Sequence, residues 1–270
     1  MLKSLPSFRK PPVIETVLGL EFTPLDDWLI SHFGLFFGDN SADFAKFEAK
    51  GELPPSIESF TEQTTKLVPQ VQLVEAPDIR GWYVSEDDSE IIQIQKDRFI
   101  FNWRKGESES PYPRYDEYLK PRFIERYSAF TSFLSKHHIE SPKVQQCEVT
   151  YVNHIPKGEG WQSPDDWRRV FTVFGQSSER KFLPKSEGGN FTMTYLLPEQ
   201  RGRLRVTVAN VVRLKDGIEV LQFNVSARVK PKGSDIDEII RSFNLGRDWV
   251  VQGFADLTTY QMHQLWEQLP

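Results

Sequence analysis

One local pattern occurs twice in this chain, and its repetition limits the folds that the chain can adopt. Residues 13–22 follow the two-residue period of a β-strand, and residues 144–153 do the same. Each predicted strand is followed by an Asp-Asp-Trp motif, at residues 26–28 and 165–167, and then by a short aromatic-rich stretch. We expect these acidic pairs to cap the helix that follows, because carboxylates accept from the free N–H groups at a helix start.

The remainder of each half also follows one plan. Strand-like segments are separated by turn signals, such as Lys96-Asp97 in the first half and Asp216-Gly217 in the second. Each half closes on a long segment with helical spacing of apolar residues, at 115–135 and 236–255. Pro121 predicts that the first of these helices begins there or carries a kink. The predicted strands are residues 81–84, 91–95 and 98–103 in the first half, and 191–197, 204–214 and 220–229 in the second.

The sequence therefore predicts an α+β fold in which a β-α-(antiparallel β-meander)-α unit occurs twice. The first repeat spans residues 1–140 and the second spans 141–270, and residues 38–69 form an insertion without a counterpart. We expect two curved antiparallel sheets, each crossed by a long helix. Both a saddle like that of the TATA-binding protein and a helix-grip arrangement satisfy this pattern, and so does one continuous sheet.

Composition restricts the class of protein. The net charge of −5 argues against non-specific binding of duplex nucleic acid, which requires a surplus of Lys and Arg. A single cysteine, Cys147, excludes an intramolecular disulfide and fits a reducing compartment. The N-terminal residues lack the apolar segment of a secretory signal, and no apolar run is long enough to span a membrane. We expect a cytoplasmic protein without a membrane partner.

No motif in the sequence indicates catalysis. The five histidines lack metal-ligand spacing, and there is no glycine-rich phosphate loop. Cys147 shares an alternating strand face with Val149 and Tyr151, which favours a buried cysteine over a nucleophile. The sequence therefore predicts no catalytic residue, no metal site and no cofactor, and an enzyme would need a site assembled without any local motif.

The best candidates for function are basic, amide and aromatic residues on predicted strands. Along residues 98–104, Phe99, Phe101 and Trp103 alternate with Arg98, Asn102 and Arg104, so one face is buried and the other is able to contact a ligand. Arginine suits bidentate contacts to phosphate or carboxylate. The alternative is a solvated face whose arginines pair with the chain's own acidic residues. The candidate binding residues are Arg98, Asn102, Trp103, Arg104, Arg114, Tyr115, Asn153, His154, Arg203 and Arg205.

Several stretches resemble a known family. They are PPVIE at residues 11–15, QIQKDRFIFNWR at 93–104, YPRY at 112–115, EVTYVNHI at 148–155, and residues 249–259 near the C-terminal end. Together they resemble a sporadically distributed family of uncharacterised bacterial proteins of about this length. The resemblance spans nearly the whole chain but implies no particular activity. Patchy distribution suits genes that move horizontally, such as defence or toxin–antitoxin components.

Three hypotheses of function follow. The leading one is a non-catalytic recognition protein that binds a macromolecular partner, most simply a protein, through its duplicated sheet or the groove between its halves. The second is nucleic-acid binding by a saddle-like sheet, through arginines and stacked aromatics. The third is a helix-grip pocket for a small molecule or nucleotide. The sequence leaves the oligomeric state open, so a homo-oligomer is compatible with it.

Overall fold

The nine strands in the described part of the chain form one antiparallel sheet. The computed structural model describes residues 5–58, 79–106, 112–175 and 182–270. The strand order is β2-β3-β4-β5-β1-β6-β9-β8-β7, so the expectation of two separate sheets was wrong. The strands are β1 (Val13–Phe22), β2 (Lys46–Gly51), β3 (Ile79–Val84), β4 (Glu90–Gln95), β5 (Arg98–Arg104), β6 (Val144–Pro156), β7 (Asn190–Leu196), β8 (Gly202–Val212) and β9 (Glu219–Val229).

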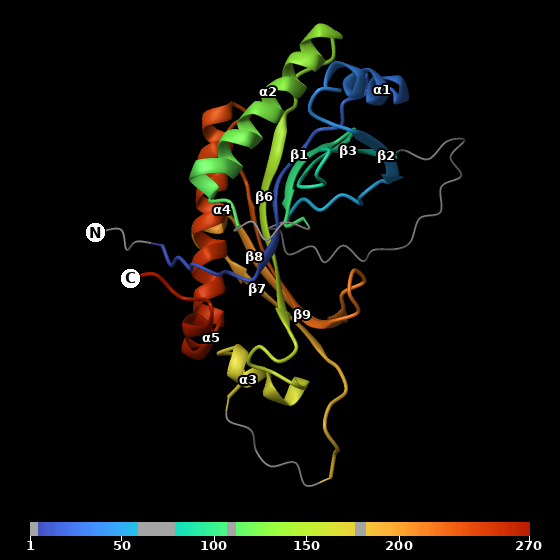
Figure 1. Cartoon of the computed structure of the whole chain (residues 1–270). Coiled ribbons are helices and arrows are strands. Elements are labelled where there is room, and N and C mark those ends of the chain that lie inside the picture. The colour runs from blue at the N-terminus through green and yellow to red at the C-terminus, as the bar shows by residue number, and fades with distance from the viewer. Residues whose placement is uncertain (1–4, 59–78, 107–111, 176–181) are drawn as a thin grey trace.

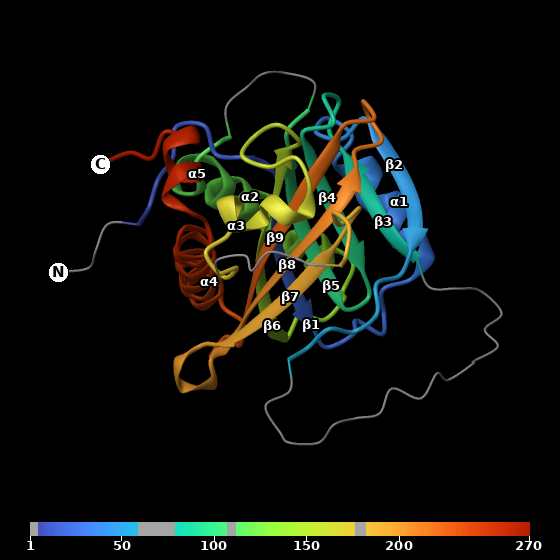
Figure 2. The same ribbon diagram turned by 90° about the horizontal axis from the view of Figure 1, so that it is seen from below.

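Two long helices, α2 (Lys120–Lys136) and α4 (Ile236–Leu257), cover one face of this sheet (Figure 1). Aromatic side chains on one side of the strands point toward this face and pack on the helices. Phe99 stacks on Phe130 with ring centroids 5.1 Å apart, and Phe223 stacks on Phe254 with centroids 5.5 Å apart. Figure 2 shows the same two helices beside the curved sheet from another direction. The shorter helices are α1 (Ile30–Asp39), α3 (Trp167–Val170) and α5 (Tyr260–Leu265). None of the helices in the described part of the chain has the length and apolarity of a membrane span.

Local sequence signals account for most element boundaries. The alternating residues 13–22 form β1 and residues 144–156 form β6. Pro121 lies in the first turn of α2, where its missing N–H is tolerated, and a π-helical turn at Tyr115–Leu119 precedes it. Cys147 is buried as expected, and burial raises the pKa of its thiol to about 12.

The two Asp-Asp-Trp motifs differ in structure. Asp166 accepts hydrogen bonds from the backbone N–H groups of Gln162 and Ser163, at 3.0 and 3.2 Å, and so caps the turn that leads into α3. The prediction for Asp26-Asp27 was wrong, because α1 begins after Leu29 and has no acidic residue in its first turn. The predicted aromatic-rich helix of the second half is also shorter than expected, since α3 has only 4 residues.

Two features have no counterpart in the predicted repeat. The predicted insertion contains β2, which pairs with β3 at the edge of the sheet, and its residues 59–69 lie outside the described residues. The N-terminal arm, residues 5–10, runs beside the C-terminal end of the chain. Arg9 N–H donates to the Glu267 carbonyl at 3.0 Å, and Leu269 N–H donates to the Ser7 carbonyl at 2.8 Å. The N-terminal arm and the last residues of the chain are therefore neighbours (Figure 1).

The start of α1 predicts a pH-dependent stability. The Leu29 N–H donates to Nδ1 of His32 at 2.9 Å, which requires that nitrogen to be unprotonated. Burial, and secondly the nearby His137, lower the pKa of His32 below 6.5. The stabilisation is therefore complete above pH 6.5 and is lost as the pH falls through the lowered pKa of the folded state.

Thermal unfolding of the native protein and of His32→Gln, measured at a series of pH values, checks this prediction. The glutamine can accept the same hydrogen bond without titrating, so the variant should lose less stability than the native protein between neutral and acidic pH. Equal losses would show that His32 does not contribute. His154 and His263, whose pKa values are also lowered by burial, are present in both proteins and cancel in the comparison.

Candidate binding sites on the open face and at the centre of the sheet

The face of the sheet opposite α2 and α4, called the open face here, is lined with polar side chains. In β5, Phe99, Phe101 and Trp103 point toward the helices and are buried. Arg98, Asn102 and Arg104 therefore lie on the open face. Their cross-strand neighbours include Glu21 and Glu15 of β1, which pair in register with Arg98 and Arg104.

Two of the predicted site residues on the open face are held by the chain itself. Arg98 donates to Glu21 at 3.1 Å, and both side chains are less than 10% exposed. Asn102 donates to Glu15 at 2.6 Å and accepts from Gln93 at 2.7 Å. The acidic partners that the sequence offered as an alternative explanation are therefore present at these two positions.

A segment of the chain also crosses the open face. Residues 53–58, which follow β2 and are called the strap here, contact side chains of several strands. Arg98 donates to the Pro54 carbonyl at 3.0 Å, and Arg228 donates to the Ser56 carbonyl at 3.0 Å. The strap ends at Glu58, which forms ion pairs with the predicted site residues Arg203 and Arg205 at 2.5 and 3.4 Å.

A second site, called the basic groove here, lies where the first and second halves of the sheet meet. It encloses about 930 Å³ between the start of β1, the ends of β5 and β6, the β8–β9 turn, and α5. Among the described residues, six Lys and Arg side chains and three carboxylates line it. The cations are Arg9, Lys10, Arg104, Lys105, Arg213 and Lys215, and the carboxylates are Glu15, Glu159 and Asp216.

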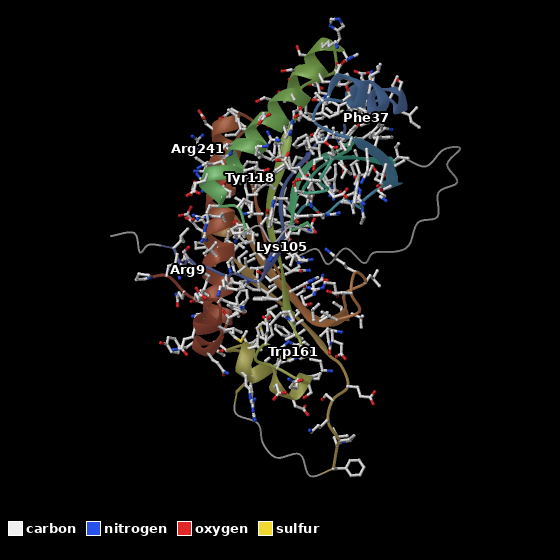
Figure 3. All side chains as sticks on the ribbon, viewed as in Figure 1. Arg9, Phe37, Lys105, Tyr118, Trp161 and Arg241 are labelled. Carbon is white, nitrogen blue, oxygen red and sulfur yellow. The ribbon has the colours of Figure 1, made fainter. Side chains whose placement is uncertain are left out.

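Several of these cations already have partners. Arg9 and Lys10 pair with Glu267 at 3.3 and 2.5 Å, Arg104 lies 3.4 Å from Glu15, and Arg213 is held by Asp216 of the same turn. Lys105 is exposed, and within the described ranges no carboxylate pairs with it. Figure 3 shows Lys105 at the end of β5 and Arg9 on the N-terminal arm at a similar level of the molecule. The described residues that line this concave surface thus carry a surplus of positive charge.

His154 and Glu159 are two groove residues whose pKa values are shifted chiefly by burial. Burial lowers the pKa of His154, and Arg213 nearby acts in the same direction, so the imidazole is neutral at pH 7. Its Nδ1 is buried without a hydrogen-bond partner among the described residues. Burial raises the pKa of Glu159. The raised pKa of Glu159 reduces the cost of placing an anion in the groove, because the carboxyl loses its charge more readily, whereas the lowered pKa of His154 keeps the imidazole neutral until the pH falls below 6.5.

The remaining predicted site residues have structural positions. Trp103 packs against Tyr112 on the face of the sheet that α2 and α4 cover, with ring centroids 5.6 Å apart. Arg114 donates to the Phe8 carbonyl at 3.0 Å and so holds the N-terminal arm. Tyr115 donates to Asn244 of α4 at 3.0 Å, and Asn153 donates to the Phe223 carbonyl at 2.9 Å. Arg114, Tyr115 and Asn153 line a cavity of about 120 Å³ beside α4, which is well below the ~300 Å³ at which ligand pockets begin.

Sequence reasoning missed the groove as a unit. Its cations come from three basic pairs, Arg9-Lys10, Arg104-Lys105 and Arg213-x-Lys215, which lie far apart in the chain. The available signal was that each pair lies at or close to one end of a predicted strand. The pairing of the two chain ends, which brings Arg9 and Lys10 to the groove, has no local sequence signal.

Among the described residues, no three His, Cys, Asp or Glu side chains lie together in a way that could hold a metal ion. No protein-family model, no curated protein and no solved structure matches the chain.

Proposed function

We propose that this chain is a recognition protein that binds an acidic segment of a partner protein in the basic groove, without catalysing a reaction. The observation that carries the proposal is the charge of the groove: of the residues that the structure describes, six cations and three carboxylates line a concavity of about 930 Å³. A protein with a net charge of −5 that concentrates cations in one concave place favours anionic ligands there over the rest of its surface.

The exposed apolar residues next to the groove support a protein ligand. Leu214 lies between the groove residues Arg213 and Lys215 and is 98% exposed, and Leu265, which lines the groove, is 46% exposed. Side chains of this kind lose water on contact with apolar groups of a partner. A segment that combines Asp or Glu with apolar side chains would match both features.

Nucleic acid is less well supported as the ligand. Binding of single strands without sequence preference depends on aromatic rings on which bases stack. Among the described strand residues, only Trp82 places a ring on the open face, and the guanidinium of Arg104 covers it at 4.9 Å. Trp266, which lines the groove, is 2% exposed and so offers almost no surface for stacking.

Lys105→Glu is expected to weaken binding of an acidic peptide by about fivefold to tenfold, since it reverses an exposed charge within the groove. Fluorescence anisotropy with a short labelled peptide in which Glu alternates with Ser measures this affinity. Binding should also weaken as salt is added, because the contacts are exposed.

Lys143→Glu is the matched control. Lys143 is also exposed but pairs with Glu140 in the connection between α2 and β6, far from the groove along the chain, so its reversal should leave the affinity unchanged. Equal weakening by the two variants would mean that the peptide responds to overall charge and would reject the groove. Tighter binding of single-stranded DNA than of the peptide would favour the nucleic-acid hypothesis instead.

We also propose that the sheet consists of two copies of one β-α-(β-meander)-α unit. Outward from the central pair β1–β6, the order is β5, β4, β3 on one side and β9, β8, β7 on the other, and each half ends in a long helix on the same face. This symmetry supports a saddle-like arrangement over a helix-grip one. It also explains why a groove forms at the centre, where the ends of the two central strands meet.

A further inference from the structure

The strap crosses the open face in the order of the strands beneath it. Leu53 exchanges two hydrogen bonds with the Gln95 side chain of β4, both at 3.1 Å. The Pro54 carbonyl accepts a hydrogen bond from Arg98 of β5. Ser56 donates to Glu21 of β1, and Glu58 N–H donates to Gln146 of β6 at 2.9 Å. The strap therefore lies across the strands as an extended peptide would on a binding surface.

Most of these contacts involve the backbone of the strap. The side chains of Gln95, Arg98 and Arg228 contact N–H or C=O groups at Leu53, Pro54 and Ser56, which any extended peptide can offer. Gln146 adds a bond of 3.3 Å to the Ser56 carbonyl. The open face can thus hold an extended chain largely without regard to its side chains.

Glu58 supplies the selective contact. Its carboxylate lies 2.5 Å from Arg203, 3.4 Å from Arg205 and 3.7 Å from Arg228, and the Glu58 side chain is only 11% exposed. Three guanidinium groups that converge on one carboxylate are a strong and geometrically selective anion site. Beside this site lies a hollow of about 350 Å³ lined by Ile57, Gln146, Gly202 and Lys230, among others.

We infer that the open face is a second binding site, for an extended acidic segment of a partner protein, and that the strap occupies it as an internal ligand. Gln95, Arg98 and Arg228 hold the backbone of the segment, and Arg203, Arg205 and Arg228 bind a carboxylate side chain at the Glu58 position. This site uses residues that the basic groove does not contain, so it stands independently of the function proposed for the groove.

Occupation in cis makes the site selective. A tethered segment competes at an effective concentration in the millimolar range, so a weak external peptide cannot displace it. A partner gains access only if its segment binds better than the strap or if the strap loses its Glu58 contact. A substitution that weakens the contacts of the strap should therefore expose the site, and a separate peptide with the sequence of the strap should then bind there.

The test uses a labelled synthetic peptide with the sequence of residues 50–58, amidated at its C-terminus so that the Glu side chains are its only carboxylates. Fluorescence anisotropy measures its affinity for the full chain and for Glu58→Gln, which removes the charge of the internal ligand but keeps its shape. We expect the variant to bind the peptide at least about tenfold more tightly than the native chain. Ser56→Ala, which removes the hydroxyl that donates to Glu21, is a second opening variant and should act in the same direction.

The arginine contact is tested within the opened protein. Arg205 is 47% exposed, and adding Arg205→Ala to Glu58→Gln should return the affinity to that of the native chain. Replacing the last Glu of the peptide by Gln should have the same effect. The inference is overturned if neither opening variant binds more tightly than the native chain, or if the gained binding survives both Arg205→Ala and the Gln peptide. Lys105→Glu should not alter this binding, which separates the result from that for the basic groove.

Discussion

Glu90→Ala is expected to lower the free energy of unfolding by about 3 kcal/mol, because it removes the buried carboxylate that Arg122 and Arg126 share and leaves them only their more exposed partners, Glu125 and Asp43. Glu90 begins β4, and its side chain is 5% exposed. Arg122 of α2 donates to both of its carboxylate oxygens at 2.7 Å, and Arg126 lies 3.3 Å away. Tyr118 also donates to it. These bonds connect the sheet to α2, so their loss affects the packing of the first half.

Urea unfolding measures this loss as a fall in the midpoint at an unchanged slope. Glu125→Ala is the matched control, since Glu125 also pairs with Arg122 but is 55% exposed and should contribute within about 1 kcal/mol. Burial acts to raise the pKa of Glu90, but hydrogen bonds from Arg122 and Tyr118 outweigh it and hold the pKa below 4.5. The stabilisation is therefore present above pH 4.5 and lost as the pH falls further. A loss no larger than that of Glu125→Ala would show that the network contributes little.

The same network shows why the candidate site was difficult to predict. Arg98, Arg122 and Arg126 are near one another in the sequence, which suggests a single basic cluster. In the structure, Arg98 pairs with Glu21 on the open face, whereas Arg122 and Arg126 pair with Glu90 on the helix side. Strand periodicity reveals on which face a side chain lies, but the acidic partner comes from another strand and leaves no local signal.

The fold was more accessible to sequence reasoning than the sites. Two-residue periodicity predicts β1, β5 and β6 well. In a strand with one buried face, a shift of one residue would move the buried aromatic and aliphatic side chains to the opposite face, so the pattern is strict. The edge strand β2 was missed, because its sequence, KFEAKG, has only one large apolar residue and the strand is mostly exposed. The strap and the paired chain ends depend on contacts between distant residues, and neither has a periodic pattern.

Gly202→Ala is expected to lower the free energy of unfolding by about 2–3 kcal/mol. Gly202 begins β8 opposite Val229 of β9. A Cβ at this position would overlap the carbonyl oxygen of Arg228 and lie 3.1 Å from the Cα of Val229. Both are backbone atoms, so β8 and β9 must separate where Arg203 and Arg228 converge on Glu58.

Gly253→Ala in α4 provides the comparison. Its Cβ would meet only the end of the Leu204 side chain, at 2.7 Å, which can move, and alanine gains about 1 kcal/mol in helix propensity. We therefore expect a net change within about 1 kcal/mol for this variant. Because separation of β8 and β9 displaces Arg228, which also holds a peptide bound in trans, Gly202→Ala should weaken binding of the strap peptide to the chain opened by Glu58→Gln, whereas Gly253→Ala should not. Equal stability of the two variants would show that the β8–β9 contact relaxes without cost, and that the arginine site does not depend on the glycine.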